Sequence, residues 1–319
     1  VKLQDIPVGL LGEVLRPLWQ EALQEIRADH QAGADGREIA ARIAVAMDAV
    51  VGATYQRAAA QARGRHALVA LGGYGRGEMA PHSDVDLLFL FEKDEDKSPE
   101  FISGVLNPLW DMAFEVGHSS RTLGEVARYA REDLESCTAM MDGRLLAGDE
   151  SLYVEFLARL YKKVPKRTVT RLNNWRLQRI EARQSVQLLE PNVKESPGGL
   201  REMQVFEWAL KARARSSAID ALWGQFLDVG DVESLARSRA FLWRVRHELH
   251  FAVGRKRDVL DHDLKPQIAA EMGYVDEGQE LAAERFMRDY YLHARTVYHL
   301  VELAFKRLNR KPRNSSRSM

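Results

Sequence analysis

The 319-residue sequence lacks several features that would point to a function at once. It has one cysteine, Cys137, which excludes an internal disulfide and a zinc site with the usual two to four cysteines. It has no run of about 18 uncharged apolar residues, the length that a membrane-spanning helix needs. Basic and acidic residues number 46 each, so the net charge gives no general attraction to nucleic acid or membrane. We expect a cytoplasmic protein in which Cys137 is a small buried residue on a helix.

The two ends of the chain show no targeting signal. The first residues are interrupted by charges at Asp5, Glu13 and Arg16 and lack a small-residue cleavage site, so we interpret them as a helical segment. Because the chain begins with Val1, we expect either a piece of a longer protein or a stand-alone relative of one. Residues 309–319 are basic, polar and aperiodic, which predicts a disordered tail; a basic contact arm is the alternative.

Helical patterns dominate the sequence. Residues 9–63 are rich in helix-forming residues at helical spacing, with a break at 33–36. Three short apolar runs predict strands, at 66–71, 85–91 and 114–121. Ser98 and Pro99 have the residue types of a helix start, and Thr122 is expected to cap another helix. Long amphipathic helices are predicted at 166–187, 200–217, 231–253 and 277–308.

These patterns predict an α+β fold that is mostly helical, with a small mixed sheet. We divide the chain into an N-terminal helical segment (1–60), a mixed α/β domain (61–147), a helical domain (148–308) and the tail (309–319). The domain with the strands carries the unusual residue choices, so we expect the functional site there.

A glycine-rich turn follows the first predicted strand. Four glycines lie within six residues, Gly72, Gly73, Gly75 and Gly77. Glycine lets backbone N–H groups approach a phosphate closely and adopts positive φ. Arg76 adds a cation for the same phosphates, and Ser83 can bond a phosphate oxygen or cap the turn. The turn matches neither the P-loop nor the dinucleotide-binding motif.

Two aspartates, Asp84 and Asp86, begin the second predicted strand. Residues two apart on a strand point to the same side. Two carboxylates so placed repel each other and are costly to desolvate unless a cation lies between them. Mg²⁺ (or Mn²⁺) binds carboxylates together with phosphate oxygens and water. We therefore predict a metal-dependent nucleotide site with Asp84 and Asp86 as metal ligands and catalytic residues.

The order strand, Gly-Gly, ten residues, Asp-Val-Asp resembles the signature of the DNA polymerase β-type nucleotidyltransferase superfamily. Five segments are further similar to the bifunctional uridylyltransferase/uridylyl-removing enzymes, which modify the nitrogen-signalling protein PII. They are GGYGRGEMAPHSDVDLLFLF, WDMAFEVGHSSRT, LEPNVKESPGGLREMQVFEWALKAR, FLWRVRHELHFAVGRKRDVL and RFMRDYYLHARTVYHL. Two positions depart from that family's pattern, since Ser196 stands for glycine and Glu202 for aspartate. The resemblance implies a nucleotidyltransferase domain over 61–147.

The resemblance also implies a reaction, the transfer of UMP from UTP to a tyrosine hydroxyl of PII with release of pyrophosphate. On that basis Asp84 and Asp86 bind metal, and the oxygens of the triphosphate are held by Gly72, Gly73 and Ser83. Positioning and charge neutralisation would supply most of the catalysis. Full-length members also carry a phosphohydrolase domain and two glutamine-sensing ACT domains, for which this chain has no room. We do not interpret the dipeptide His262-Asp263 as a metal site.

A third metal ligand is left open by the sequence. Superfamily members commonly place another acid on a neighbouring strand, where Gly117 stands in this chain and cannot serve. Glu115, two residues earlier, would face the same side, and Asp133 on the following helix is its rival. We include Glu115 in the predicted metal set. His118 could touch a phosphate, but we interpret it as structural.

The segment around Pro197-Gly198-Gly199 has two readings. It could place backbone donors and Lys194 or Arg201 near the nucleotide, or it could be a helix entry turn with exposed charges. The tryptophans in helical patterns are interpreted as core residues, namely Trp175, Trp208, Trp223 and Trp243.

Two other functions fit the same residues. The chain could be an adenylyltransferase that uses ATP and modifies another protein, or a regulatory module that binds a nucleotide without turnover. A nucleic-acid substrate is not expected, because no part of the chain is strongly basic.

Overall fold

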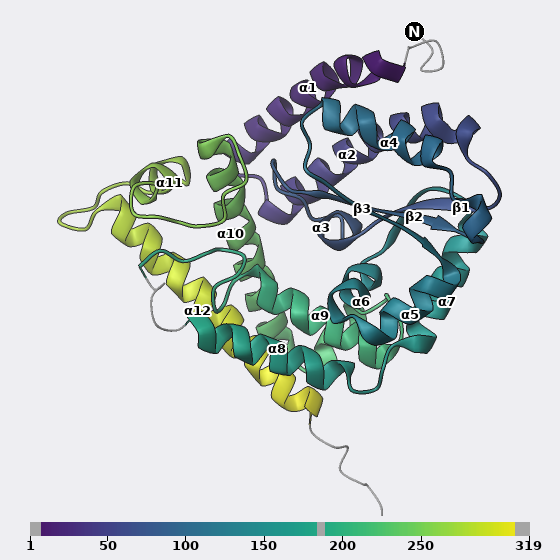
Figure 1. Ribbon diagram of the computed structural model, residues 1–319. Helices are drawn as coiled ribbons and strands as arrows, with labels where there is room; N and C mark the ends of the chain where they lie inside the picture. The colour runs from purple at the N-terminus through teal and green to yellow at the C-terminus, as the bar shows by residue number, and fades with distance from the viewer. Residues whose placement is uncertain (1–7, 184–188, 310–319) are drawn as a thin grey trace, which may run out of the picture.

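The computed structural model describes residues 8–183 and 189–309. Helices surround a four-stranded mixed sheet in the order β3-β2-β1-β4 (Figure 1). The strands are β1 (His66–Ala70), β2 (Val85–Phe91), β3 (Val116–Thr122) and β4 (Arg144–Gly148). β1 is antiparallel to both β2 and β4, whereas β2 and β3 are parallel. The predicted mixed-sheet, mostly helical α+β class is confirmed; residues 310–319 of the predicted tail lie outside the described residues.

The helices fall before, within and after the sheet. Those up to the last strand are α1 (Leu11–Gln31), α2 (Gly36–Ala58), α3 (Gly72–Gly75), α4 (Pro99–Asp111), α5 (Leu123–Glu132) and α6 (Leu134–Met141). Those after it are α7 (Glu150–Lys163), α8 (Thr168–Arg183), α9 (Leu200–Ala214), α10 (Val229–Val253), α11 (Lys265–Glu271) and α12 (Ala282–Asn309). The break predicted at 33–36 separates α1 from α2. The predicted helix starts are also present, since the Ser98 hydroxyl accepts the Phe101 N–H and Thr122 forms a capping box with Glu125.

One strand, β4, was not predicted. Its sequence Arg-Leu-Leu-Ala-Gly is short, follows a helix almost directly, and contains no β-branched or aromatic residue. It lies at the edge of the sheet beside β1, and its residues are only partly buried. Pairing with the central strand β1, rather than a local pattern, therefore makes this segment a strand.

Both faces of the sheet are covered by helices. On one face Leu87, Phe89 and Phe91 share a core with α1, α2 and α4. On the other face Leu88 and Leu90 share a core with α5, α6 and α7. A strand buried on both faces reads as a continuous apolar run, which explains the sequence Val-Asp-Leu-Leu-Phe-Leu-Phe. Since side chains alternate along a strand, Asp86 lies on the same side as Leu88 and Leu90.

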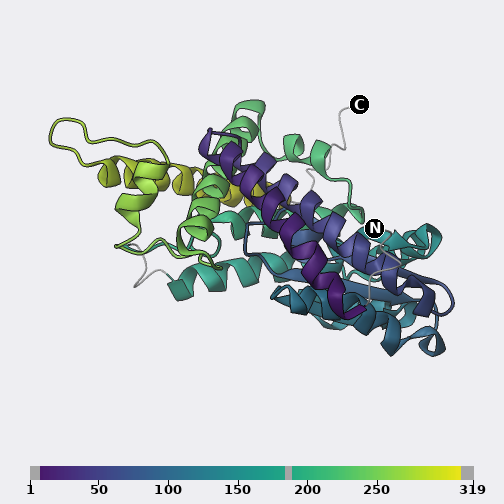
Figure 2. The same cartoon turned by 90° about the horizontal axis from the view of Figure 1, so that it is seen from above.

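The helices α8 to α12 form a third core. Its largest buried side chains include Trp243, Phe206, Phe286 and Phe305. Trp208 is also buried in this core, and Trp175 and Trp223 pack against it, which confirms the interpretation of the tryptophans. Figure 2 shows α11 and the start of α12 projecting to one side of the molecule. None of the helices within the two described ranges is both long and apolar enough to cross a bilayer.

A buried carboxylate joins the sheet part to the helical part. Asp142, just after α6, accepts hydrogen bonds from Trp208 Nε1 at 2.8 Å, Lys211 Nζ at 2.7 Å and Arg76 at 2.5 Å. Arg76 also contacts Glu78, which in turn pairs with Arg239 of α10. Buried charges are costly unless they are paired and hydrogen-bonded. This network therefore holds α9 and α10 in place against the glycine-rich turn.

Candidate active site

The glycine-rich turn brings the backbone close to Asp86. Gly72 has φ = +56°, and a β-carbon there would lie 3.1 Å from Asp86 Oδ2. The Leu71 N–H donates to the Asp86 carbonyl at 2.9 Å, so the turn and the start of β2 are tied together. At Gly75 a β-carbon would lie 2.2 Å from the Asp142 carbonyl oxygen. Glycine is therefore required at 72 by conformation and at 75 by space.

Asp84 and Asp86 line a single cavity of about 190 Å³ together with Gly72, Gly73, Arg76 and Ser83. Burial and the neighbouring Asp84 charge raise the pKa of Asp86, although Lys194 and Lys256 oppose this. Burial alone would raise the pKa of Asp84, but the hydrogen bond from Lys256 at 2.5 Å, the interaction with Glu115 and the charges of Lys256 and Lys194 together outweigh it, and the pKa lies below its usual value. The two carboxylates therefore share one partly desolvated space.

Four cationic side chains from the helical part complete the lining of this cavity, Lys194, Arg201, Arg246 and Lys256. Burial, with the charges of Arg246 and Arg201, lowers the pKa of Lys194 to about 8. A buried lysine whose pKa is lowered by nearby cations favours the binding of an anion, because the anion offsets the repulsion between the positive charges. The cavity thus combines two acids on the sheet side with a cationic wall on the helical side.

The segment 194–201 is a helix entry turn, but its charged residues Lys194 and Arg201 are partly buried rather than exposed, and their contact with a nucleotide remains a prediction. Its side chains Lys194 and Arg201 face the cavity. Its glycines form a tight helix entry, because Gly198 has φ = +77° and a β-carbon there would lie 2.1 Å from the Ala294 carbonyl oxygen of α12. Gly199 is the N-cap of α9.

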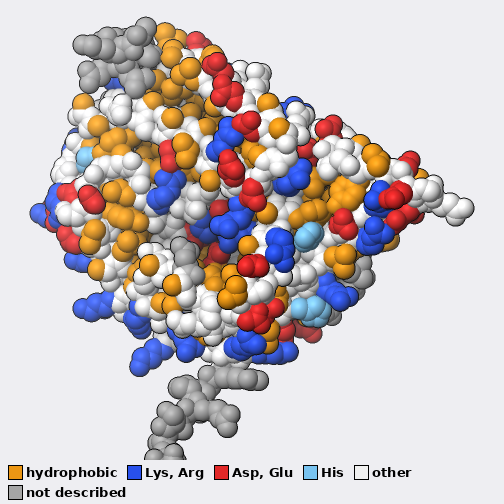
Figure 3. Space-filling model, turned by 180° about the vertical axis from the view of Figure 1, so that it is seen from behind, with side chains coloured by type: hydrophobic (Ala, Val, Ile, Leu, Met, Phe, Trp, Pro, Cys, Tyr) orange, Lys and Arg blue, Asp and Glu red, His pale blue; other side chains and the backbone are white. Residues whose placement is uncertain are grey.

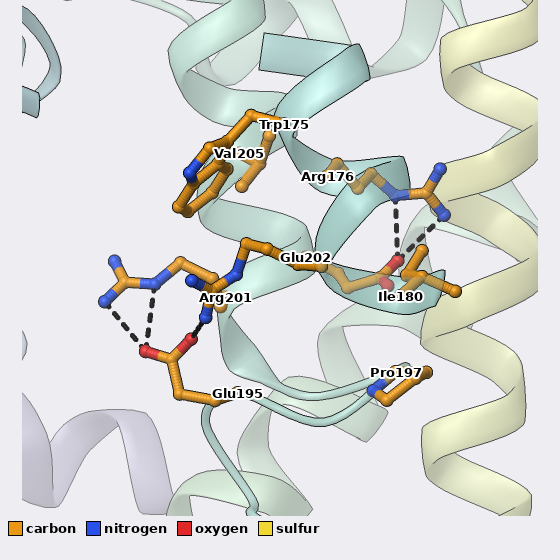
Figure 4. A pocket seen from close by; sticks show the side chains of 9 residues that line it. Trp175, Arg176, Ile180, Glu195, Pro197, Arg201, Glu202 and Val205 are labelled. Carbon is orange, nitrogen blue, oxygen red and sulfur yellow. Dashed lines mark hydrogen bonds and ion pairs between the residues drawn. The ribbon is translucent and has the colours of Figure 1, made fainter. Parts of the chain in front are cut away.

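Arg201 is held in place by Glu195. Figure 4 shows the guanidinium of Arg201 beside the Glu195 carboxylate, which also forms an ion pair with Arg179 of α8. Beside them Arg176 donates two hydrogen bonds to Glu202, at 3.0 and 2.9 Å. These ion pairs brace α8 against α9 and the segment before it, which carry two of the four cations, Arg201 and Lys194.

Arg76 and Ser83 already have partners within the protein. The Arg76 guanidinium donates to Glu78 at 2.9 Å and to Asp142 at 2.5 Å. The Ser83 hydroxyl accepts the Ala80 N–H at 2.9 Å and so caps the turn before Asp84. Both residues line the cavity; their role as phosphate ligands remains a prediction.

Gly117 lies directly beside Asp86 in the parallel pairing of β2 and β3. A β-carbon at Gly117 would lie 2.4 Å from Asp86 Oδ1, so no side chain fits there. Glu115 has a side chain 77% exposed, with its Oε2 4.0 Å from Lys256 Nζ at the edge of the site. Asp133 instead caps α6, accepting the Ser136 N–H at 2.9 Å. Over residues 8–183 and 189–309, no three His, Cys, Asp or Glu side chains form a metal-binding group, and Glu115 stays a prediction.

Several other residues lie away from this cavity. His118 is exposed and contacts the ring of Trp110, with centroids 5.9 Å apart. His262 and Asp263 are exposed in the loop before α11. Cys137 is buried on α6, as expected. Arg246 and Lys256 were not identified from the sequence: no local motif marks them, and only the similarity of the segment 241–260 to the uridylyltransferases pointed to this region.

A second cavity of about 500 Å³ adjoins the first. The two share four lining residues, Glu135, Thr138, Arg201 and Trp208. The larger cavity is also lined by Arg171 and Trp175 of α8. A molecule that places an anionic group among the four cations can therefore extend along α8 into a larger space.

Two protein-family models match the chain. A nucleotidyltransferase domain matches residues 56–141, and GlnD PII-uridylyltransferase matches residues 168–305. The first range includes the glycine-rich turn and both aspartates, and the second includes Lys194, Arg201, Arg246 and Lys256. The acidic and the cationic sides of the cavity thus belong to two separately recognised segments.

Curated relatives match over most of the chain and are named bifunctional uridylyltransferase/uridylyl-removing enzymes. The protein of Phenylobacterium zucineum is 39% identical over 83% of this chain and 30% of its own length. That of Azotobacter vinelandii is 37% identical over 91% and 33%, and that of Cereibacter sphaeroides is 40% identical over 76% and 27%. The chain spans about a third of the length of these relatives. It is an enzyme of the nucleotidyltransferase type, related to the bifunctional uridylyltransferase/uridylyl-removing enzymes.

Proposed function

We propose that this protein is a cytoplasmic, metal-dependent uridylyltransferase. It transfers UMP from UTP to a tyrosine hydroxyl of a PII-type signalling protein and releases pyrophosphate. The observation that carries the proposal is the cavity in which Asp84 and Asp86 face Lys194, Arg201, Arg246 and Lys256. A triphosphate with its metal has the complementary charge for both walls. The names of the relatives support uridylyl as the transferred group.

Asp84 and Asp86 are suited to hold Mg²⁺ or Mn²⁺. Asp84 Oδ1 is buried and has no hydrogen-bond partner among the described residues, and carboxylate oxygens are the ligands that these hard cations prefer. When bound, the ion would neutralise charge on the triphosphate and on the attacking oxygen. Glu115 remains our proposed third ligand.

The protein's own side chains would position the donor. Lys194, Arg246 and Lys256 would balance the charge of the triphosphate, and the bend at Gly72-Gly73 and Ser83 would let the backbone approach it. The nucleoside would extend past Arg201 into the adjoining cavity. The tyrosine oxygen then attacks the α-phosphorus while the bond to the β-phosphate breaks.

A protein acceptor fits the surface better than a nucleic acid does. On the face shown in Figure 3, acidic and basic side chains are interspersed with apolar ones. Nucleic-acid-binding surfaces instead carry a basic patch or stripe. We therefore favour a signalling protein as the acceptor.

The proposal is tested by incubating the protein with α-labelled UTP, Mg²⁺ or Mn²⁺ and a PII protein. We expect label on the PII tyrosine with the wild-type chain and almost none with Asp84→Asn. Absence of transfer by the folded wild type, or transfer undiminished in Asp84→Asn, would contradict the proposal. Running ATP, CTP and GTP alongside separates the alternatives: transfer from ATP alone indicates an adenylyltransferase, and binding without pyrophosphate release indicates a regulatory module.

A further inference from the structure

Asp258 lies in the loop between α10 and α11 and does not line the cavity. Its side chain is 11% exposed, and its Oδ1 accepts two hydrogen bonds. One comes from Arg246 Nε at 2.7 Å and the other from His250 Nε2 at 3.2 Å. Arg246 is one of the four cations of the cavity. The Asp258 carboxylate therefore orients a cavity residue directly.

His250 extends this contact to the acidic side of the site. Its side chain is fully buried, and its Nδ1 accepts the backbone N–H of His82 at 3.2 Å. Because Nε2 faces a carboxylate, Nε2 carries the ring proton and Nδ1 is free to accept. His82 precedes Ser83 and Asp84. Asp258 thus holds the turn that presents Asp84, with His250 as the intermediate.

The backbone of Asp258 reaches a third part of the site. Its carbonyl accepts the Val193 N–H at 2.8 Å, directly before Lys194. The neighbouring pair Asn192 and Val259 forms a β-bridge, and the Leu260 N–H donates to the Pro191 carbonyl at 2.9 Å. The loop around Asp258 is therefore paired as a short ribbon with the segment that carries Lys194.

We propose that Asp258 is a positioning residue, which sets the Asp84 turn, the Arg246 guanidinium and the Lys194 segment relative to one another. The proposal rests on the nucleotidyl transfer proposed above and concerns how that site is assembled. Asp258 touches no substrate; it acts through His250, Arg246 and the backbone of Val193. Its contacts therefore link residues from both the acidic and the cationic side of the cavity.

The kinetic test uses Asp258→Ala and Asp258→Asn, with Asp263→Asn as the matched control on an exposed carboxylate of the same loop. A displacement of about 1 Å in a catalytic site costs about 10²-fold in rate, so we expect a loss of that order in Asp258→Ala. We expect the transfer rate of the Asp263→Asn control to equal that of the wild type. Asp258→Asn keeps one acceptor oxygen, so its transfer rate should fall less than that of Asp258→Ala.

Two further variants separate the effect on the Asp84 turn from the effect on the Arg246 guanidinium. His250→Ala releases only the Asp84 turn and should lower kcat with little change in the KM for UTP. Arg246→Gln affects only the cation and should mainly raise that KM. Asp258→Ala should show both effects together. His250→Gln, which retains a donor and an acceptor, should recover part of the kcat that His250→Ala loses.

Hydrogen exchange gives a readout independent of turnover. We expect Asp258→Ala to exchange faster than wild type at 80–84, which the Asp258 side chain reaches through His250, and Asp263→Asn to leave this segment unchanged. The Val193 N–H bonds to the backbone carbonyl of residue 258, which alanine keeps, so segment 192–196 should change less. Wild-type kinetics together with wild-type exchange in Asp258→Ala would overturn the proposal; if that variant does not fold, the same comparison is made with Asp258→Asn. If the wild type transferred no UMP, the proposed function would fail, and the exchange comparison would still decide the positioning role.

Discussion

The sheet part and the helical part contribute opposite charges to the same cavity. The lining residues from the sheet part and α6 include four acids, Glu78, Asp84, Asp86 and Glu135, and one base, Arg76. The lining residues from the helical part include four bases and no acid. Arg76 is itself paired with Glu78 and Asp142, which makes the contrast sharper. Each part alone would therefore present a surface of one sign, and the site exists only where they meet.

The opposite charges of the two sides offset the energetic cost of burying each of them. The carboxylates lie at the start of a strand, where the glycine-rich turn and the pairing with β3 hold them rigidly. The cations lie on α9 and α10, on the segment before α9 and on the loop after α10, and ion pairs such as Glu195 with Arg201 brace them. Like charges crowded in a low-dielectric space raise each other's energy, and bringing the two walls together relieves both. A substrate that carries metal and triphosphate meets the same two walls.

The largest effect is expected from removing a charge on the acidic wall. In Asp86→Asn we expect the rate of UMP transfer to fall on the order of 10³-fold, because metal-ion stabilisation amounts to several kcal/mol and each 1.36 kcal/mol is tenfold in rate. The shape is kept, so the unfolding midpoint should not fall. Steady-state kcat measures the effect, with the exposed Asp111→Asn as control. A kcat within threefold of wild type would show that the acidic wall is not catalytic.

A loss on the order of 10²-fold in rate is expected for Gly117→Ala, since a shift of about 1 Å at a catalytic site has that effect. The added β-carbon would lie 2.4 Å from Asp86 Oδ1 and must displace the carboxylate. Gly124→Ala is the matched control, because the nearest atom to its β-carbon is 3.7 Å away. Equal rates in the two variants would mean that the position of Asp86 is not critical.

On the cationic wall, Lys194→Met should raise the KM for UTP about tenfold with a smaller change in kcat, since a hydrogen bond to a charged group contributes about 1.5–3 kcal/mol. Methionine retains the length and apolar stem of lysine, so the packing is largely preserved. The exposed Lys163→Met serves as control. If the variant lost kcat but kept its KM, Lys194 would act on the reacting phosphate rather than on donor binding.

The smallest effect concerns pH. The Lys194 pKa is about 8, so its charge is present below that pH and is lost above it. We expect UTP affinity, measured calorimetrically with Mn²⁺, to fall about fivefold from pH 7 to pH 9, as loss of an interaction of roughly tenfold strength requires. Lys194→Arg should remove this dependence because guanidinium stays charged. A pH dependence unchanged in Lys194→Arg would assign the titration to another group.

The acidic wall could be predicted from the sequence, whereas on the cationic wall only Lys194 and Arg201 were candidates and Arg246 and Lys256 were not. Asp84, Asp86 and the glycines lie within fifteen residues, so their spacing alone indicates their chemistry. Arg246 lies in the middle of a long helix and Lys256 in an irregular loop, where a basic residue is ordinarily solvent-exposed. Their convergence depends on how α10 packs against α2 and α12, which is decided by the core and not by a local pattern.

Strand β4 and the carboxylate partners of Arg76 could not be predicted for the same reason, because they depend on the assembled fold and not on a local pattern. β4 forms because β1 offers an unpaired edge, and that edge is a property of the assembled sheet. The Arg76 side chain was expected to bind phosphate, yet its carboxylate partners Glu78 and Asp142 are brought to it by a turn and by α6. Contacts between residues 66 positions apart leave no trace in periodicity or spacing.

The buried carboxylate of Asp142 limits which residues of this protein can be substituted independently of one another. Its three side-chain donors, Arg76, Trp208 and Lys211, come from two parts of the chain, and its side chain is fully buried. Without the charge at 142, Lys211 would lose its carboxylate partner and Arg76 would keep only Glu78, and loss of either cation would leave Asp142 with one charged partner. We therefore expect these positions to change together. Among aligned relatives, 76, 142, 208 and 211 should covary as a group, and a hybrid that joins the sheet part of one relative to the helical part of another should fold only when all four come from the same parent.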